Sequence, residues 1–178
     1  MDTSGFAHPP RNVQALGIEP GMSVADFGSG SGAYVLLIAE ALAGSGHVYA
    51  CDVQKDLLRR TYNEAKKKNL HNVKVLWGDL ERPGGSKLAD DSQDLVLISN
   101  LLFQVDDKNA VLAEAARITK NGGRVAIIDW TDSFGGMGPA RDAVFTKESA
   151  LAAAAEAGLR FVSEFPAGAH HYGLIFTK

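Results

Sequence analysis

The sequence predicts an α/β domain built on a doubly wound, mostly parallel sheet. Short apolar runs rich in β-branched residues alternate with helical segments along the 178 residues. Most of these runs are continuously apolar, as expected for parallel strands that helices cover on both faces. The last two runs have no helix between them, which predicts an antiparallel C-terminal pair at one edge of the sheet. We therefore expect residues 1–178 to form one three-layer domain.

The order of the elements follows from these patterns. Parallel strands are predicted at residues 23–27, 47–51, 72–77, 94–99 and 124–129. Helices are predicted at residues 33–42, 55–68, 107–120 and 147–157. The third helix is expected to end in a C-cap at Asn121-Gly122-Gly123, because Gly readily adopts the left-handed conformation that closes a helix. Residues 160–165 and 172–178 form the predicted antiparallel pair.

Composition restricts the class of protein. The chain is 46% hydrophobic and carries a net charge of −3, so the molecule as a whole has no attraction for nucleic acid. The single cysteine, Cys51, has no partner for an internal disulfide. No apolar run approaches the ~20 residues of a membrane span. The first twelve residues lack the basic and apolar regions of a secretory signal, so we expect a cytoplasmic protein.

Three glycines stand at alternate positions between the first strand and the first helix. Gly28, Gly30 and Gly32 occupy the turn where open α/β sheets bind ligands, outside the carboxyl ends of the strands. One such glycine is explained by packing of strand against helix. Three together predict a ligand that lies against bare backbone, close to the free N–H groups of the helix.

A carboxylate stands in or just after each of the first three predicted strands. Gly28-x-Gly30-x-x-Ala33, followed by Asp52, satisfies the relaxed dinucleotide pattern, so NAD is a candidate ligand. Asp26, however, lies two residues before the first glycine, where it would repel a pyrophosphate and attract a cationic ligand. Asp79 follows the third strand, where it could accept a hydrogen bond from an adenine amino group.

These motifs, in this order, resemble those of class I S-adenosylmethionine-dependent methyltransferases. The resemblance rests on VADFGSGSGAY, Cys51-Asp52, Gly78-Asp79, DLVLISNLL and the turn at residues 121–123, and it covers nearly the whole chain. It is nearest to the branch typified by ubiquinone and menaquinone biosynthesis. It implies a Rossmann-like fold with a reversed last strand and S-adenosylmethionine as the cofactor.

The resemblance also implies which residues hold the cofactor. The three glycines would pass under its methionine portion, with Asp26 near the ammonium and Tyr34 at the start of the helix. Asp52 would bind the ribose hydroxyls, and Asn100 would border the sulfonium. The full implied set is Asp26, Gly28, Gly30, Gly32, Tyr34, Asp52, Val53, Asp79, Leu80, Asn100 and Leu101.

The acceptor and any catalytic base are less defined by the sequence. Methyl transfer needs a base only where the acceptor must lose a proton. Candidates near the strand ends are Tyr34, Asp129 and the pair His170-His171, of which we select Asp129 and His170. No metal site is predicted, because the histidine pair lacks carboxylates at a ligand spacing.

Several functions are compatible with these patterns. We favour an enzyme that methylates a small molecule. SNLLFQ after the fourth strand departs from the Asn-Pro-Pro-Tyr motif of many nucleic-acid amino-methyltransferases, and a single cysteine does not fit multi-cysteine arsenic methylation. An RNA or protein acceptor stays open, as does the oligomeric state. The alternatives are an NAD-dependent oxidoreductase and a cofactor-binding subunit without turnover of its own.

Overall fold

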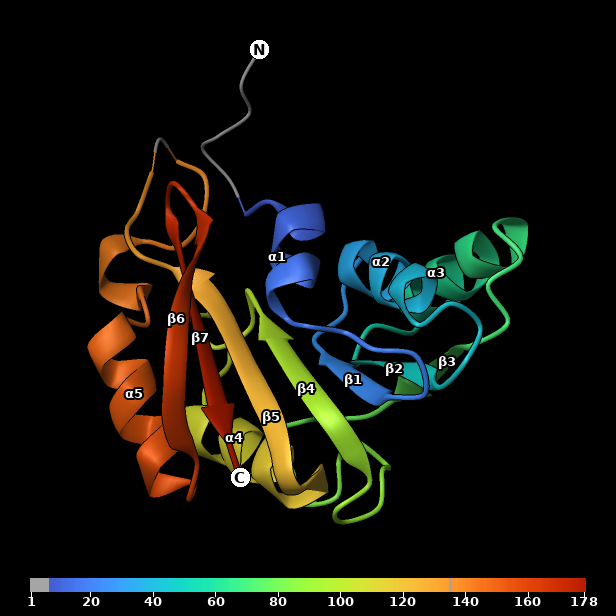
Figure 1. Cartoon of the computed structure of the whole chain (residues 1–178). Helices are drawn as coiled ribbons and strands as arrows, with labels where there is room; N and C mark the ends of the chain where they lie inside the picture. The colour runs from blue at the N-terminus through green and yellow to red at the C-terminus, as the bar shows by residue number, and fades with distance from the viewer. Residues whose placement is uncertain (1–6, 135) are drawn as a thin grey trace.

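Seven strands form one sheet in the order β3-β2-β1-β4-β5-β7-β6 (Figure 1). The computed structural model describes residues 7–134 and 136–178. Strands β1 to β5 pair in parallel, and β7 runs antiparallel to both β5 and β6. The predicted fold class is therefore confirmed, including the reversed C-terminal strand. The expectation about the first twelve residues falls partly on residues 1–6, which lie outside the described residues.

The elements have the following bounds. The strands are β1 Ser23–Phe27, β2 His47–Asp52, β3 Val73–Trp77, β4 Gln93–Ser99, β5 Thr119–Trp130, β6 Arg160–Gly168 and β7 His171–Thr177. The helices are α1 Pro9–Ala15, α2 Ala33–Ala41, α3 Lys55–Lys67, α4 Lys108–Ile118 and α5 Lys147–Glu156, with a 3-10 turn, η1, at Arg141–Ala143. No helix in the described part of the chain is long and apolar enough to cross a membrane.

Two hydrophobic cores sandwich the sheet. Helices α1, α2 and α3 pack on one face, and α4 and α5 pack on the other (Figure 1). Neighbouring residues of a strand point to opposite faces. Val24 accordingly belongs to the first core, whereas Ala25 belongs to the second. This explains why the strands are continuously apolar in sequence.

The predicted end of the third helix is wrong. Helix α4 ends at Ile118, and Thr119 already has the extended conformation of β5 and pairs with Gln93. Residues 121–123 lie within β5, where the register against β4 shifts. Gly122 has φ +78°, and its N–H donates to the carbonyl of Lys178. This glycine therefore bonds to the C-terminal residue next to β7 and does not close a helix.

A short helix that the sequence analysis did not predict, α1, packs against α2. Its buried Asn12 donates from Nδ2 to the Tyr34 hydroxyl (2.9 Å) and to the Ala167 carbonyl (3.0 Å). These two bonds join α1 to α2 and β6. Tyr34 is thereby fixed at the carboxyl end of the sheet.

We predict that Asn12→Ala destabilises the fold. A buried polar group left without its partner costs about 1–3 kcal/mol. This change removes the Asn12 donor from the Tyr34 hydroxyl and leaves the Ala167 carbonyl with the N–H of His8 alone (3.1 Å). The urea midpoint should fall with an unchanged slope. The control is Asn63→Ala on the exposed face of α3, expected to change stability by less than about 0.5 kcal/mol. Equal midpoints for the two variants would contradict the anchoring role of Asn12.

Candidate active site

The three glycines of the turn between β1 and α2 all have left-handed backbone conformations, but they differ in how closely other atoms surround them. Gly28, Gly30 and Gly32 have φ values of +69°, +53° and +82°. A Cβ at Gly28 would lie 2.8 Å from Leu101, and one at Gly32 would lie 2.6 Å from Thr61. At Gly30 the nearest such atom is 3.9 Å away. Packing thus contributes to the need for glycine at the first and third positions, whereas Gly30 presents bare backbone to open space.

Asp52, at the end of β2, ties this turn to the neighbouring strand. Its Oδ2 accepts from the N–H of Gly30 (2.9 Å), and its Oδ1 accepts from the N–H of Gln54 (2.8 Å). The side chain is buried. A carboxylate oxygen has two lone pairs, so each oxygen can still accept a hydroxyl from a ligand. The predicted ribose contact is therefore chemically possible here, and it stays a prediction.

Asp26, on β1, is an unusually placed acid. It is only 2% exposed. Burial, together with the nearby charge of Asp52, raises its pKa to about 8. The carboxyl group is therefore mostly neutral at pH 7. A cation bound beside Asp26 would favour the ionised form and be attracted by it.

Two adjoining cavities open above the turn, and both are lined by Gly28, Gly30 and Gln104. One, of about 250 Å³, is lined by the acid at the end of β2 and by acids that follow β3. The other, of about 380 Å³, contains Asp26 and the ends of β4 and β5. None of the described residues that line either cavity is Lys or Arg. Together the cavities form a cleft whose charged groups are acidic.

The smaller cavity brings together the residues predicted to bind the adenosine half of the cofactor. Asp52, Val53, Asp79 and Leu80 all line it. Leu101, which the resemblance places with Asn100 at the methionyl end, also lines this smaller cavity and not the larger one. Leu80 is buried and Val53 is 56% exposed, so two aliphatic side chains border the space. The Asp79 carboxylate accepts from the N–H of Glu81 at 3.0 Å.

The larger cavity contains the residues predicted for the methionine half. Asp26, Tyr34 and Asn100 line it, whereas Gly32 lies below it against α3. Asn100 has φ +51°, a conformation that Asn tolerates better than most residues. Its Oδ1 lies 3.0 Å from Nε2 of His171.

The two predicted bases do not line either cavity. Asp129 is buried and accepts from the N–H groups of Trp130 (2.8 Å) and Phe103 (3.3 Å). Burial raises its pKa to about 6, although these hydrogen bonds oppose the shift. His170 points elsewhere: its Nδ1 lies 2.8 Å from Oδ1 of Asp132, and its ring stacks on Phe134. Catalysis by Asp129 or His170 stays a prediction without support from cavity geometry.

His171 is the histidine that borders the cleft, and the sequence analysis did not select it. It is 4% exposed, and its ring lies 4.2 Å from that of Trp130. With the Asn100 amide in this orientation its oxygen accepts from Nε2, which assigns the proton to that nitrogen, and Nδ1 is buried without a partner among the described residues. Burial lowers the pKa of His171 to about 4, aided by His170, so the ring is neutral at pH 7.

Comparison with known proteins places the chain in a family. Residues 18–169 match the model of a methyltransferase domain family. A structure described as an S-adenosylmethionine-dependent methyltransferase from Aquifex aeolicus superposes with a TM-score of 0.85 at 25% identity, over 96% of this chain and 89% of that one. The chain therefore belongs to the class I S-adenosylmethionine-dependent methyltransferases.

The curated relatives are longer than this chain and match only part of it. Demethylmenaquinone methyltransferase of Listeria welshimeri is 31% identical over 118 residues, which are 66% of this chain and 48% of the relative. Arsenite methyltransferase of Halobacterium salinarum is 30% identical over 110 residues, 62% of this chain and 27% of that protein. The chain thus spans about half the length, or less, of these curated relatives.

We predict that Asp26→Asn stabilises the ligand-free protein at high pH. An unfolded Asp ionises near pH 4, whereas the folded Asp26 ionises only near pH 8. The wild-type protein therefore loses stability as pH rises from 4 to 8, and Asn does not titrate. Each pKa unit corresponds to about 1.4 kcal/mol, so the variant should gain a few kcal/mol above pH 8. Urea midpoints at pH 4.5 and 8.5 test this, and a pH-independent difference would contradict it.

Proposed function

We propose that this protein binds S-adenosylmethionine in the cleft and transfers its methyl group to a small-molecule acceptor. The observation that carries the proposal is the acidic cleft over the half-buried Gly30 backbone. Asp26, Asp52 and Asp79 line it from three neighbouring strand ends, and none of the described lining residues is a cation. Asp79 is paired with Arg82, whose side chain lies outside the lining, at 3.4 Å. Such a site attracts a ligand with ammonium and sulfonium groups and repels a pyrophosphate. This favours S-adenosylmethionine over NAD.

The two cavities match the two halves of this cofactor. In the smaller cavity, Asp52 would accept the ribose hydroxyls, and Val53 and Leu80 would border the adenine. In the larger, Asp26 would face the ammonium, and Asn100 would lie beside the sulfonium. When bound, the cofactor supplies an activated methyl group. The contribution of the chain is then to hold donor and acceptor in line, which can provide much of the catalysis.

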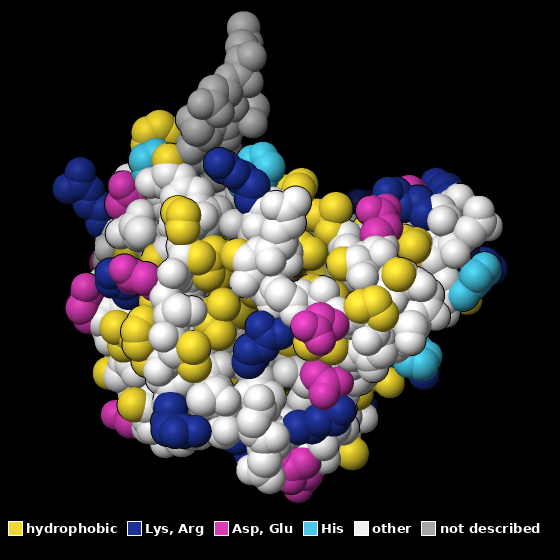
Figure 2. All heavy atoms as spheres, in the orientation of Figure 1, with side chains coloured by type: hydrophobic (Ala, Val, Ile, Leu, Met, Phe, Trp, Pro, Cys, Tyr) yellow, Lys and Arg dark blue, Asp and Glu magenta, His cyan; other side chains and the backbone are white. Residues whose placement is uncertain are grey.

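The remaining wall of the larger cavity suits a small organic acceptor with a ring. Tyr34, Trp130 and His171 contribute aromatic surface there. The menaquinone relatives are consistent with such an acceptor. An arsenic acceptor is disfavoured, because the only cysteine, Cys51, is buried in the core. On the face shown in Figure 2, basic and acidic side chains are interspersed, which gives no reason to prefer RNA.

His171 is the side chain best placed to receive the acceptor. Its ring is neutral at pH 7, and its Nδ1 lone pair has no partner within the described residues. We propose that the acceptor binds against the His171 ring, and that a rotation of this ring brings Nδ1, which is buried in the ligand-free structure, to an acceptor hydroxyl and orients its oxygen toward the methyl group. As the bond from oxygen to methyl carbon forms and the carbon–sulfur bond breaks, the hydroxyl proton passes to Nδ1 or to water.

The cofactor is tested by thermal unfolding with S-adenosylmethionine, S-adenosylhomocysteine and NADH added separately. A ligand at 100 times its dissociation constant stabilises a protein by about 2.7 kcal/mol, which raises the melting temperature by several degrees. We expect a shift with the two sulfur ligands only. Asp52→Ala should abolish the shift, whereas Asp56→Ala on the exposed face of α3 should keep it. A shift with NADH alone would overturn the proposal.

The acceptor group is tested by a matched pair of variants, His171→Asn and His170→Asn. We expect His171→Asn to lower kcat at least ten-fold with small phenols or quinols, as loss of a general base does. His170→Asn should stay within about two-fold, because its ring lies outside the cleft, and the KM for the cofactor should change in neither. Release of S-adenosylhomocysteine measures turnover. Cofactor binding without release by the wild type on any acceptor would support the alternative of a cofactor-binding subunit.

A further inference from the structure

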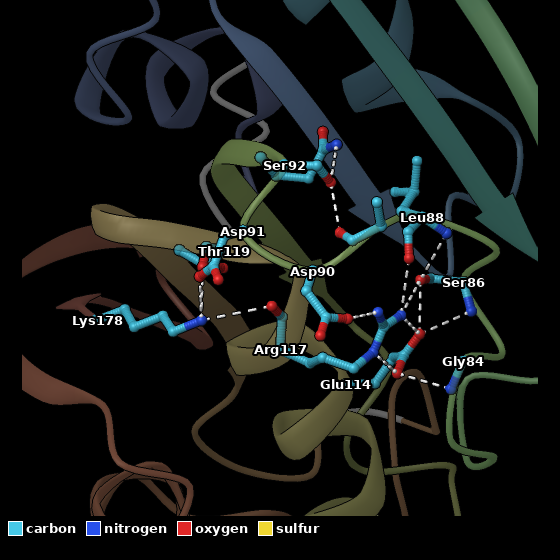
Figure 3. A network of polar contacts seen from close by, with 12 residues as sticks. Gly84, Ser86, Leu88, Asp90, Asp91, Ser92, Glu114, Arg117, Thr119 and Lys178 are labelled. Carbon is cyan, nitrogen blue, oxygen red and sulfur yellow. Dashed lines mark hydrogen bonds and ion pairs between the residues drawn. The ribbon is translucent and has the colours of Figure 1, made fainter.

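A buried carboxylate behind the cleft, Glu114 of α4, is the centre of a polar network (Figure 3). The side chain of Glu114 is only 2% exposed. It accepts five hydrogen bonds: from the N–H of Gly84 (3.0 Å), the N–H and hydroxyl of Ser86 (3.0 and 2.6 Å), and Nε and Nη2 of Arg117 (2.9 and 2.7 Å). The network therefore joins α4 to the segment between β3 and β4.

All five partners are placed to donate, so only a carboxylate can satisfy them. In a glutamine, one oxygen would become an NH2 group facing the N–H of Gly84 or the donors of Ser86. Burial raises the pKa of Glu114, but the hydrogen bonds from Arg117, Ser86 and Gly84 lower it to about 2. The group is thus ionised throughout the neutral range. Arg117 extends the network to the carbonyl of Leu88 (2.9 Å) and to Asp90.

The segment that Glu114 holds is packed directly against the adenosine half of the cleft. A Cβ on Gly78 would lie 1.8 Å from the Gly85 oxygen, and a Cβ on Gly85 would lie 1.7 Å from the Asp79 oxygen. The backbones at residues 78–79 and at residue 85 are therefore in close contact, without side chains between them. A shift of the Glu114-bound segment would displace Asp79, which lines the smaller cavity.

The start of α4 makes a second contact with the same stretch. The N–H of Asp107, the N-cap of the helix, donates to Oε1 of Glu81 at 2.6 Å. Glu81 also lines the smaller cavity. Helix α4 thus holds the chain after β3 at two points, one near its start and one in its second half. The chain between them carries no helix or strand of its own.

We propose that Glu114 is a positioning residue for cofactor binding, which acts through residues 84–86 to fix Asp79 at the adenine end of the cleft. This inference rests on the proposed function. It predicts that the loss of Glu114 weakens binding of adenosine-containing ligands while the transfer step at the other end of the cleft is unchanged. A purely stabilising role would instead lower the melting temperature without a selective effect on binding.

The experiment measures S-adenosylhomocysteine binding by calorimetry, well below the melting temperature of every variant. We expect Glu114→Gln to weaken binding about ten-fold, an effect of the size usual for coupled network residues. Ser86→Ala, which removes only the hydroxyl donor, should weaken it less. The control is Asp94→Asn, which breaks another carboxylate anchor, to Lys120 (2.7 Å) and to the N–H of Ser23 (2.8 Å), at the opposite end of the sheet. It should leave the affinity unchanged.

Double variants separate positioning from a general loss of stability. If Glu114 acts through Asp79, the affinity lost in Glu114→Gln combined with Asp79→Asn should be smaller than the product of the single losses. When Glu114→Gln is combined with Asp26→Asn, at the methionine end, the affinity loss should equal the product of the two single losses. In turnover, Glu114→Gln should raise the KM for S-adenosylmethionine and leave kcat at saturation within about two-fold.

The outcomes distinguish the two proposals. If the wild-type protein does not bind S-adenosylhomocysteine, the proposed function and the role of Glu114 both fail. If the wild type binds but Glu114→Gln binds equally well, or no more weakly than Asp94→Asn, the positioning role alone is overturned. Strict multiplication of the losses with Asp79→Asn would overturn it as well. Selective and non-multiplicative loss would support it.

Discussion

The parallel pairing of β1 with β2 and β4 is the constraint on which the candidate site depends. Parallel strands end at the same edge of a sheet, so residues that follow different strands are brought together there. In this way Asp52 and Asn100, 48 positions apart by their residue numbers, border one cleft. The cleft needs no large insertion, because β1 and α2 meet at a glycine turn whose middle residue leaves its backbone open. The parallel sheet thus determines where the polar groups lie, and the acidic side chains determine the charge of the cleft.

Burying these acids lowers the stability of the protein when no ligand is bound. Asp26 is held at low exposure near a second acid, and the pKa of about 8 expresses how unfavourable its ionised form is there. Asp52 offsets its own burial by accepting two backbone N–H groups, whereas Asp26 has no cation among the lining residues of the cleft. A cationic ligand would relieve this cost. The burial that makes ionised Asp26 unfavourable in the empty protein is thus the same feature that would favour a cationic ligand.

The sequence predicted the fold and most of the residues that line the cleft. Its predictions did not hold where side-chain direction or tertiary contacts determine the local structure. Continuous apolar strands and the glycine turn are local signals. They predicted the sheet, which the structure confirms, and a set of cofactor residues, most of which line the cleft. The pair His170-His171 is different, because His170 lies in the turn before β7 and His171 is the first residue of that strand. The folded hairpin therefore decides which of the two borders the cleft. Likewise, residues 121–123 have the composition of a helix cap, but pairing of Thr119 with β4 extended the strand through them.

The role assigned to α4 shows why some determinants of a site leave no trace in its motifs. Glu114 and Arg117 are three positions apart on a helix, a spacing that is common for exposed ion pairs of little energetic value. What distinguishes this pair is a segment near residue 85, about 30 positions earlier, whose N–H donors lie against α4 only through the tertiary fold. Sequence patterns predict the helix, but they do not predict which segment packs on it. The proposed role would thus make binding at the adenine end depend on a carboxylate that lines neither cavity.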